Sequence, residues 1–145
     1  LSMMQLKEVL NNKGGQPVIV PEASTVASAI RTMNSNHVGS VMVQAPGGEP
    51  MGILTERDMV RLYAEGESDF ETMLVKDWMT THMHIGKPND TVSEILALMT
   101  VKRFRHLPVV EDGKMVGVVS IGDLVKAKLN ETALEAQLLR DYITS

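Results

Sequence analysis

The sequence contains no cysteine, few aromatic residues and no long apolar run. Without cysteine the chain can form neither disulfides nor thiolate metal sites, which fits a cytoplasmic protein. Two Phe, two Tyr and one Trp, together with a formal net charge of −4, argue against a nucleic-acid binder that uses a basic face or stacked bases. No apolar stretch approaches the roughly 20 residues of a membrane-spanning helix. We therefore expect a chain that works without a membrane and without nucleic acid.

The most informative feature of the sequence is a short motif that occurs twice. The first copy runs from Gly52 to Asp58 (GILTERD) and the second from Gly117 to Asp123 (GVVSIGD). Each copy has a glycine, an apolar pair, a hydroxyl residue and an aspartate three positions after the hydroxyl. An apolar run followed by Ser/Thr-x-x-Asp is typical of a strand that passes directly into a capped helix. A single copy would indicate a capping box only.

The two motifs belong to a longer repeat. Thr25 aligns with Thr91 and Met33 with Met99, an offset of 66 in both cases (91 − 25 and 99 − 33). The two motif aspartates are 65 apart (123 − 58), so one residue is lost in a loop. A period that holds over this length predicts two copies of one β-α-β-β-α unit, packed against each other as a closed pair.

The residue pattern predicts the elements of each α/β repeat. Apolar residues at helical spacing predict helices over 3–10, 25–36, 56–63 and 91–102, a short helical segment over 75–79, and helices from 120 onward and over 130–142. Alternating and β-branched residues predict strands over 18–20, 41–43, 51–54, 83–86, 107–110 and 115–119. Ser24 and Asp90 are the predicted N-caps. A polar linker over 64–70 divides a first repeat with an N-terminal helix (residues 1–66) from a second repeat with a C-terminal helix (residues 67–145).

The order of these elements resembles a known family. The β-α-β-β-α repeat, the Thr-Val pair at the start of its first helix and the closing Gly-x-x-Thr/Ser-x-x-Asp are similar to the cystathionine β-synthase (CBS) domain. Two such units in tandem resemble a Bateman module, over about residues 18–128. The segments HLPVV (106–110), SIGD (120–123) and LRDYIT (139–144) are similar to those of stand-alone bacterial proteins that consist of one CBS pair.

The resemblance implies that adenosine binds in the cleft between the two repeats. On the motif positions, the ribose hydroxyls would contact Thr55 with Asp58 and Ser120 with Asp123. A carboxylate can accept both vicinal hydroxyls in charge-assisted hydrogen bonds, and a helix N-terminus suits a phosphate. The resemblance places the adenine against the early strand of the other repeat. The set Val38, Gly39 and Ser40 would then lie near Ser120 and Asp123, and the set Phe104, Arg105 and His106 near Thr55 and Asp58.

Several cationic residues have a simpler interpretation beside the functional one. Arg103 and Arg105 could clamp a phosphate, for which the guanidinium geometry is suited, or could be solvated residues at a helix end. His82 and His84 share one face at strand spacing, but neither cysteine nor an evident carboxylate completes a metal site. We therefore include Arg103 and His84 among the candidate ligand contacts and predict no metal site.

The sequence thus predicts a non-catalytic regulatory protein that senses an adenine nucleotide. AMP is the first candidate, with ADP, ATP or NAD(H) as further possibilities, and no metal is required. The predicted partners are a second copy of the chain, which resembling modules use for pairing, and an unknown effector protein. Two alternatives stay open: a constitutive dimeric scaffold without ligand, and a metal-binding or nucleic-acid-binding module that uses the His and Arg residues.

Overall fold

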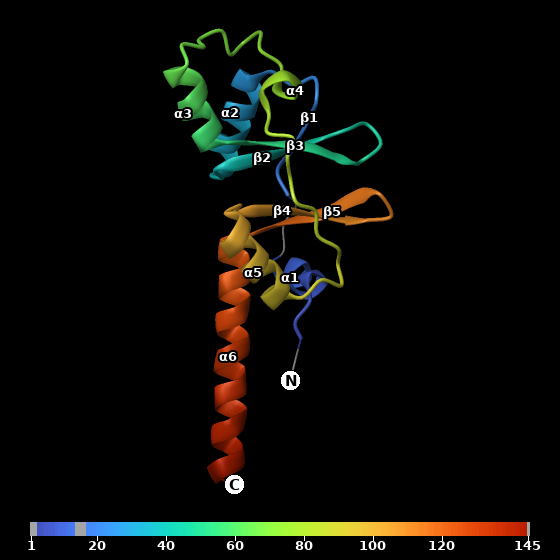
Figure 1. Cartoon of the computed structure of the whole chain (residues 1–145), viewed down its shortest axis with the longest axis vertical. Coiled ribbons are helices and arrows are strands. Elements are labelled where there is room, and N and C mark those ends of the chain that lie inside the picture. The colour runs from blue at the N-terminus through green and yellow to red at the C-terminus, as the bar shows by residue number, and fades with distance from the viewer. Residues whose placement is uncertain (1–2, 14–16, 145) are drawn as a thin grey trace. The chain divides into compact units, whose positions relative to one another are not determined.

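The chain folds into two compact units, each with one small sheet and its own core (Figure 1). The computed structural model describes residues 3–13 and 17–144. The first-repeat unit contains residues 17–84 and 112–115, and the second-repeat unit contains residues 3–13, 85–111 and 116–144.

The first-repeat unit is built on a three-stranded sheet in the order β1 (Ile19–Pro21), β2 (Ser40–Gln44) and β3 (Pro50–Thr55). β1 and β2 are parallel, with the crossover helix α2 (Val26–Asn36) between them. β2 and β3 form an antiparallel hairpin. α3 (Glu56–Ala64) follows β3 without a loop, and the short α4 (Val75–Trp78) completes the unit. This arrangement agrees with the predicted β-α-β-β-α order.

The second-repeat unit contains α1 (Leu6–Lys13), α5 (Val92–Lys102), the hairpin β4 (His106–Glu111) and β5 (Lys114–Ser120), and α6 (Ile121–Thr144). The strand predicted over 83–86 is not formed. Only Gly86 pairs with β4, through hydrogen bonds with Pro108 and Val110 of 2.9 Å each. A Cβ at Gly86 would lie 2.5 Å from Leu107 and 3.0 Å from Leu6, so glycine permits the close packing at this bridge.

The two hydrophobic cores confirm the repeat. Residues at an offset of 66 occupy the same place in the two units, as in Val26 and Val92 or Met33 and Met99. After the lost residue the offset of 65 holds, because Leu54 and Val119 (119 − 54) are both fully buried. Each core therefore joins one crossover helix to one hairpin, as the periodicity predicts.

The segments that precede the repeats pack on the opposite repeats. Leu6 and Val9 of α1 lie in the core of the second-repeat unit, and Val75 of α4 lies in the core of the first-repeat unit. The backbone contacts are equivalent: Val92 donates to the carbonyl of Met4 at 2.9 Å, as Val26 does to that of Met73 at 2.8 Å. The packing units therefore differ from the division at residue 66, since each preceding segment supplies apolar residues to the other repeat. The sequence does not show this exchange.

This exchange explains the glycine that opens each motif. A Cβ at Gly52 would lie 2.5 Å from Sδ of Met79 and 2.8 Å from the carbonyl oxygen of Thr80. At Gly117 it would lie 2.6 Å from a side-chain methyl of Leu10. The motif glycines therefore make room for the segments after α4 and at the end of α1, which lie directly over β3 and β5.

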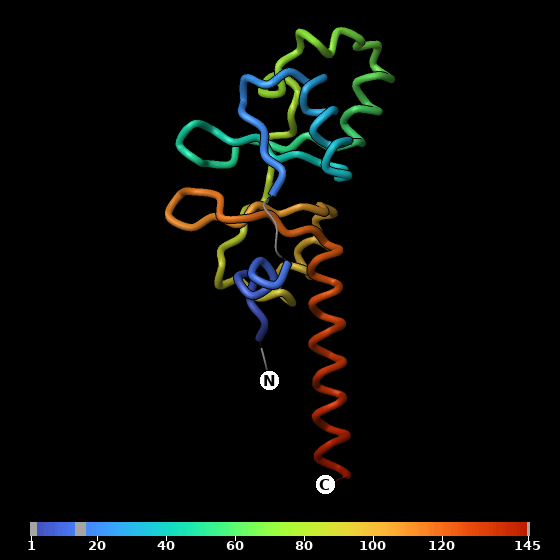
Figure 2. Tube along the Cα trace, turned by 180° about the vertical axis from the view of Figure 1, so that it is seen from behind, coloured from blue at the N-terminus to red at the C-terminus, as the bar shows by residue number. Residues whose placement is uncertain are grey.

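Three further predictions about helix ends need correction. The N-cap of α2 is Thr25, whose Oγ1 accepts the N–H of Ser28 at 3.0 Å, and not Ser24. Thr91 caps α5 in the same way, while the carboxylate of Asp90 accepts the N–H of Lys87 at 2.8 Å in the preceding turn. The two helices predicted after Ser120 form one helix of 24 residues (Figure 2). No proline, and no glycine after its second residue, interrupts α6.

Candidate functional site

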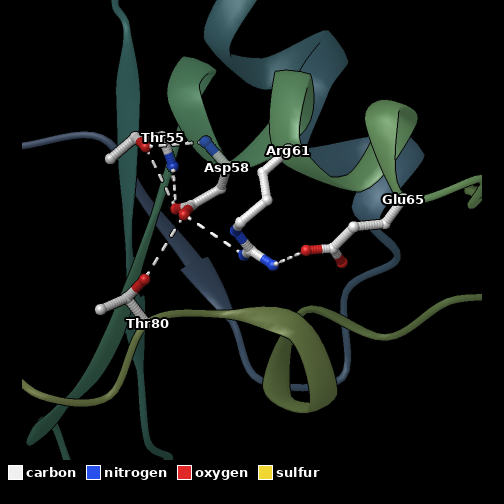
Figure 3. Close-up of polar contacts among 5 residues, drawn as sticks. All are labelled: Thr55, Asp58, Arg61, Glu65 and Thr80. Atoms are coloured by element: carbon white, nitrogen blue, oxygen red, sulfur yellow. Dashed lines mark hydrogen bonds and ion pairs between the residues drawn. The ribbon is translucent and has the colours of Figure 1, made fainter.

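The first motif forms the start of α3, where Thr55 and Asp58 cap the helix reciprocally (Figure 3). Oγ1 of Thr55 accepts the N–H of Asp58 at 3.2 Å. In return, Oδ2 of Asp58 accepts the N–H of Thr55 at 2.9 Å and its hydroxyl at 3.1 Å. This is the capping box that Ser/Thr-x-x-Asp predicts.

The remaining oxygen of Asp58 also has partners. Nη2 of Arg61 lies 3.4 Å from Oδ1, and the hydroxyl of Thr80 donates to the same atom at 3.5 Å. Arg61 also forms an ion pair with Glu65, in which Nη1 lies 3.5 Å from Oε1 (Figure 3). The side chain of Asp58 is only 12% exposed. Both oxygens of this carboxylate are therefore engaged within the first-repeat unit.

The second motif forms the start of α6 with the same reciprocal contacts. Oγ of Ser120 accepts the N–H of Asp123 at 3.1 Å, and Oδ2 of Asp123 accepts the N–H of Ser120 at 2.8 Å. The further partner differs, because Nζ of Lys13 lies 2.9 Å from Oδ2 of Asp123 and comes from α1. Lys13 also donates to the carbonyl of Val118 at 3.0 Å. With 23% of its side chain exposed, Asp123 is about twice as accessible as Asp58.

The environment of Asp123 favours its ionised form. Burial acts to raise the pKa of this carboxyl, but the hydrogen bonds from the Lys13 ammonium and the Ser120 N–H outweigh it. The pKa of Asp123 consequently lies below its ordinary value. A carboxylate that is ionised and still partly exposed can accept hydrogen bonds from a ligand.

Beside this carboxylate, Arg105 and His106 bring the early strand of the second repeat to the start of α6. The N–H of Ile121 donates to the carbonyl of Arg105 at 2.8 Å. Burial, and then the positive charges of Arg105 and Lys13, lower the pKa of His106, although Asp123 acts in the opposite direction. His106 is therefore neutral at neutral pH, when its ring can donate one hydrogen bond and accept another.

Two adjoining hollows lie along the first turns of α6. One has a volume of about 300 Å³ and combines Lys13, Asp123 and Lys126 with Val9 of α1 and with Met4, which precedes that helix. The other, of about 510 Å³, is lined by Arg105 and Gly122 and shares Lys126 and Asn130 with the first. Three cations and one carboxylate therefore surround these hollows.

A comparable hollow of about 510 Å³ lies beside the start of α3 in the first-repeat unit, but its charge is different. Val38 and Gly39 line it together with His37 and Glu56. The N–H of Glu56 donates to the carbonyl of Gly39 at 3.0 Å, and a Cβ on Gly39 would lie 3.3 Å from the Glu56 carboxyl carbon. The corresponding backbone partners in the second repeat are Arg105 and Ile121. The hollow beside α3 thus has the acidic Glu56 on its rim, whereas the hollow with Arg105 and Lys126 beside α6 has a basic rim.

The structure places the remaining predicted site residues as follows. Ser40 is paired directly opposite Thr55 in the hairpin. Phe104 packs against the second core, while Arg103 is exposed and ends α5 in the left-handed conformation with a φ of 59°. The rings of His82 and His84 meet edge to face at 6.2 Å. Each early strand thus lies beside the helix start of its own repeat.

The pairings expected across the repeats stay predictions. They join Val38, Gly39 and Ser40 to the Ser120 motif, and Phe104, Arg105 and His106 to the Thr55 motif, which belong to different units.

Sequence reasoning missed four residues of these surroundings, Lys13, Arg61, Thr80 and Lys126. Arg61 and Lys126 each follow a motif aspartate by three positions on a predicted helix, a spacing that places side chains on one face and could have revealed them. Lys13 and Thr80 reach the aspartates through the exchanged segments, for which the sequence carries no local signal.

Residues 3–13 and 17–144 contain neither a cluster of metal-ligating side chains nor a membrane-spanning helix. No group of three His, Asp or Glu side chains in this part of the chain could hold a metal ion. No helix there is both long and apolar enough to cross a membrane.

Comparison with known proteins connects this geometry to a family. The CBS domain model matches residues 6–65 and 75–130. The CBS domain-containing protein CBSX3 of Arabidopsis thaliana, a mitochondrial protein, is 36% identical over 147 residues, which cover 95% of this chain and 71% of that protein. A CBS-domain containing protein from Agrobacterium tumefaciens has a crystal structure with a TM-score of 0.78 and 34% identity, over 87% of this chain and 94% of that one.

A third relative was solved with a ligand. The structure of a CBS domain protein from Pyrobaculum aerophilum complexed with AMP has a TM-score of 0.76 and 26% identity, over 90% of this chain and 99% of that one. The two matched segments, the repeated α/β unit and these similarities agree. The chain belongs to the CBS domain family and carries two CBS domains in tandem.

Proposed function

We propose that this chain is a non-catalytic regulatory protein that binds an adenine nucleotide, with AMP as its first ligand. The relative from Pyrobaculum aerophilum that was solved with AMP supports the ligand class. The single observation that carries the proposal is the carboxylate of Asp123, which is ionised, partly exposed and set beside hollows with a basic rim.

The chemistry of an adenine nucleotide matches these groups. The vicinal hydroxyls of the ribose are donors and Asp123 is an acceptor, and hydrogen bonds to a charged acceptor are the stronger kind. Ser120 lies at the same helix start, where N–H groups favour an anion. Arg105 and Lys126 supply cations for a phosphate, and Arg103 and His84 remain further candidates for ligand contact.

The first motif has a different main role in this proposal. The carboxylate of Asp58 already accepts from Thr55, Arg61 and Thr80, so a ribose must displace one of these donors before it can bind there. We therefore infer that the Ser120–Asp123 motif binds ligand first and that the Thr55–Asp58 motif mainly holds α3 in place.

The regulatory output requires a partner, and α6 offers a surface for one. Every residue from 132 to 144 is exposed, although this stretch includes the apolar residues Leu134, Leu138, Leu139, Tyr142 and Ile143. Apolar side chains on an isolated stretch of helix gain stability by packing against another surface. We infer that a second copy of the chain covers this segment, and that an effector protein reads the state of the dimer.

One alternative has a specific observation in its favour. If the exposed part of α6 is the whole functional surface, the chain is a constitutive dimeric scaffold whose hollows bind no ligand. The capping roles of Asp58 and Asp123 are compatible with that alternative, because both aspartates stabilise helix starts without any ligand.

Binding measurements distinguish the nucleotide-binding protein from the ligand-free scaffold. The melting temperature of the protein should rise with AMP, because a ligand that binds only the folded state stabilises it by about 2.7 kcal/mol at a hundredfold excess over Kd. The panel should include ADP, ATP and NAD(H), with GMP as the control for the base. If none of the adenine nucleotides at millimolar concentration shifts the melting temperature, the result counts against the proposed function and in favour of the scaffold alternative.

A further inference from the structure

The contact between Lys13 and Asp123 bears on which ligand this protein selects. Lys13 is the last residue of α1, and the packing of Leu6 and Val9 holds this helix against the second-repeat core. Its Nζ lies 2.9 Å from Oδ2 of Asp123, the same oxygen that accepts the Ser120 N–H. In the ligand-free protein the ammonium therefore pairs with one oxygen of the carboxylate to which a ribose would bind.

The hollow at this ion pair is not neutral. Lys13 and Lys126 line a hollow of about 300 Å³ together with one carboxylate, Asp123, and with the amides of Asn12 and Asn130. Two ammonium groups against one carboxylate leave a net positive charge. A ligand that combines neutral donors for the carboxylate with a negative group for the ammonium ions complements this set.

Exchange of partners gives Lys13 a specific role. When the ribose hydroxyls bind to Asp123, they share the negative charge of this carboxylate with Nζ of Lys13, which lies at Oδ2. The ion pair of the ammonium is then weakened, and the carbonyl of Val118 is the partner that Lys13 keeps. A phosphate on the ligand gives Lys13 a new anionic partner, whereas a nucleoside without phosphate offers none.

We propose that Lys13 is a specificity-determining residue that makes the Ser120–Asp123 motif select a phosphorylated nucleoside over the free nucleoside. This inference rests on the proposed function. It goes beyond that function because it assigns the choice between nucleotide and nucleoside to one lysine, which lies outside both repeated motifs.

The first motif provides an internal contrast. The cation at Asp58 is Arg61, which lies on the same helix, and Arg61 is also paired with Glu65. Loss of the Asp58 contact therefore leaves Arg61 with a carboxylate partner. We therefore expect only the Ser120–Asp123 motif to prefer a phosphorylated nucleoside over the free nucleoside.

Calorimetric titration of AMP and adenosine into the full chain and three variants tests this inference. Lys13→Met removes the charge but keeps an unbranched side chain, Lys13→Arg keeps the charge, and Lys7→Met changes an exposed lysine on the same helix outside the hollow. We expect the parent to bind AMP at least tenfold more tightly than adenosine. Lys13→Met should weaken AMP binding by about ten- to a hundredfold, the range for a hydrogen bond to a charged group.

The same variant should bind adenosine as well as the parent or more tightly, because Asp123 is then released. Lys13→Arg should retain the preference for AMP, and Lys7→Met should behave as the parent. Equal loss of AMP and adenosine affinity in Lys13→Met would overturn the inference and make Lys13 a structural tie. Equal affinity of the parent for both ligands would overturn it while leaving the proposed function in place. If the parent binds neither ligand, the proposed function and this inference fall together.

Discussion

Asp58 and Arg61 form an ion pair of 3.4 Å within the first turns of α3, and this pair distinguishes the first motif from the second. Together with the hydrogen bonds from Thr55 and Thr80, it engages a carboxylate that is 12% exposed. Asp123 has the same capping contact but a longer-range partner, Lys13, and is 23% exposed. The two aspartates have the same sequence pattern, yet we expect substitution of Asp58 to reduce mainly stability and substitution of Asp123 to reduce mainly ligand affinity.

Asp58→Asn should mainly reduce the stability of the fold. The substitution removes the charge from a nearly buried acceptor to which Thr55, Arg61 and Thr80 donate, which costs about 1.5–3 kcal/mol. Chemical denaturation measures this loss as a lower midpoint with an unchanged slope. The control is Glu65→Gln, which removes the exposed ion pair between Arg61 and Glu65 and should cost less than about 1 kcal/mol. A loss no larger for Asp58→Asn than for Glu65→Gln would show that the contacts of Asp58 contribute little.

Alanine at the two motif glycines should have unequal effects. At Gly52 the added Cβ would lie 2.8 Å from the carbonyl oxygen of Thr80, which is backbone, so we expect a loss of about 1–3 kcal/mol from overpacking. At Gly117 the nearest atoms belong to the flexible side chain of Leu10, which can move aside. The free energy of unfolding of Gly52→Ala should therefore fall further than that of Gly117→Ala. The reverse order would contradict the packing of the segment after α4 on β3.

Stability should fall between pH 7 and pH 5, in part through His106. Its pKa in the folded protein lies below the ordinary value of about 6.5, because burial, Arg105 and Lys13 disfavour the charged ring. The unfolded chain therefore binds a proton first as the pH falls through that value, and acid favours unfolding. The pKa of Asp123 is lowered too, but its contribution is lost only below the ordinary range of a carboxyl, about pH 4.

Urea denaturation of the parent and of His106→Gln at pH 7, 6 and 5 measures this effect. The variant should lose less stability than the parent over the interval, since glutamine does not titrate. Identical losses would show that His106 does not contribute to the acid sensitivity.

Paired copies should separate when charge is placed on the exposed part of α6. Light scattering should give twice the chain mass of 15.9 kDa for the parent. Leu134→Glu with Leu138→Glu should lower it to the monomer mass, because carboxylates replace apolar side chains that are 60% and 59% exposed in the single chain. Gln137→Glu adds one charge between these positions and is the control. A monomer mass for the parent at micromolar concentration would rule out the dimer.

The sequence was sufficient for the repeat but not for the environment of its motifs. Residues such as Val26 and Val92 repeat at a fixed offset and at helical spacing, and these patterns directly reflect burial. The capping boxes were equally predictable, because their contacts join residues three positions apart. By contrast, Lys13 and Thr80 reach the aspartates through segments that pack on the opposite repeat, and no local pattern encodes that exchange.

The N-caps of α2 and α5 were predicted one residue too early. Ser24 and Thr25, or Asp90 and Thr91, are adjacent residues that can all cap a helix, so composition alone did not identify the N-cap. The strand predicted over 83–86 failed because only Gly86 reaches β4, although the residues around it alternate as a strand would.

The central claim is that Asp123 is a ligand-binding carboxylate, whereas Asp58 mainly holds α3. Calorimetric titration of AMP into Asp123→Asn and Asp58→Asn, each compared with the parent, tests it most directly. Asp123→Asn should lower AMP affinity by about ten- to a hundredfold, because the amide keeps one acceptor but loses the charge. Its stability should fall by about 1 kcal/mol at most, the value of a helix-dipole contact. Asp58→Asn should lower stability more and AMP affinity less. If Asp123→Asn binds AMP as tightly as the parent, the aspartate is only a cap and the proposed site is wrong.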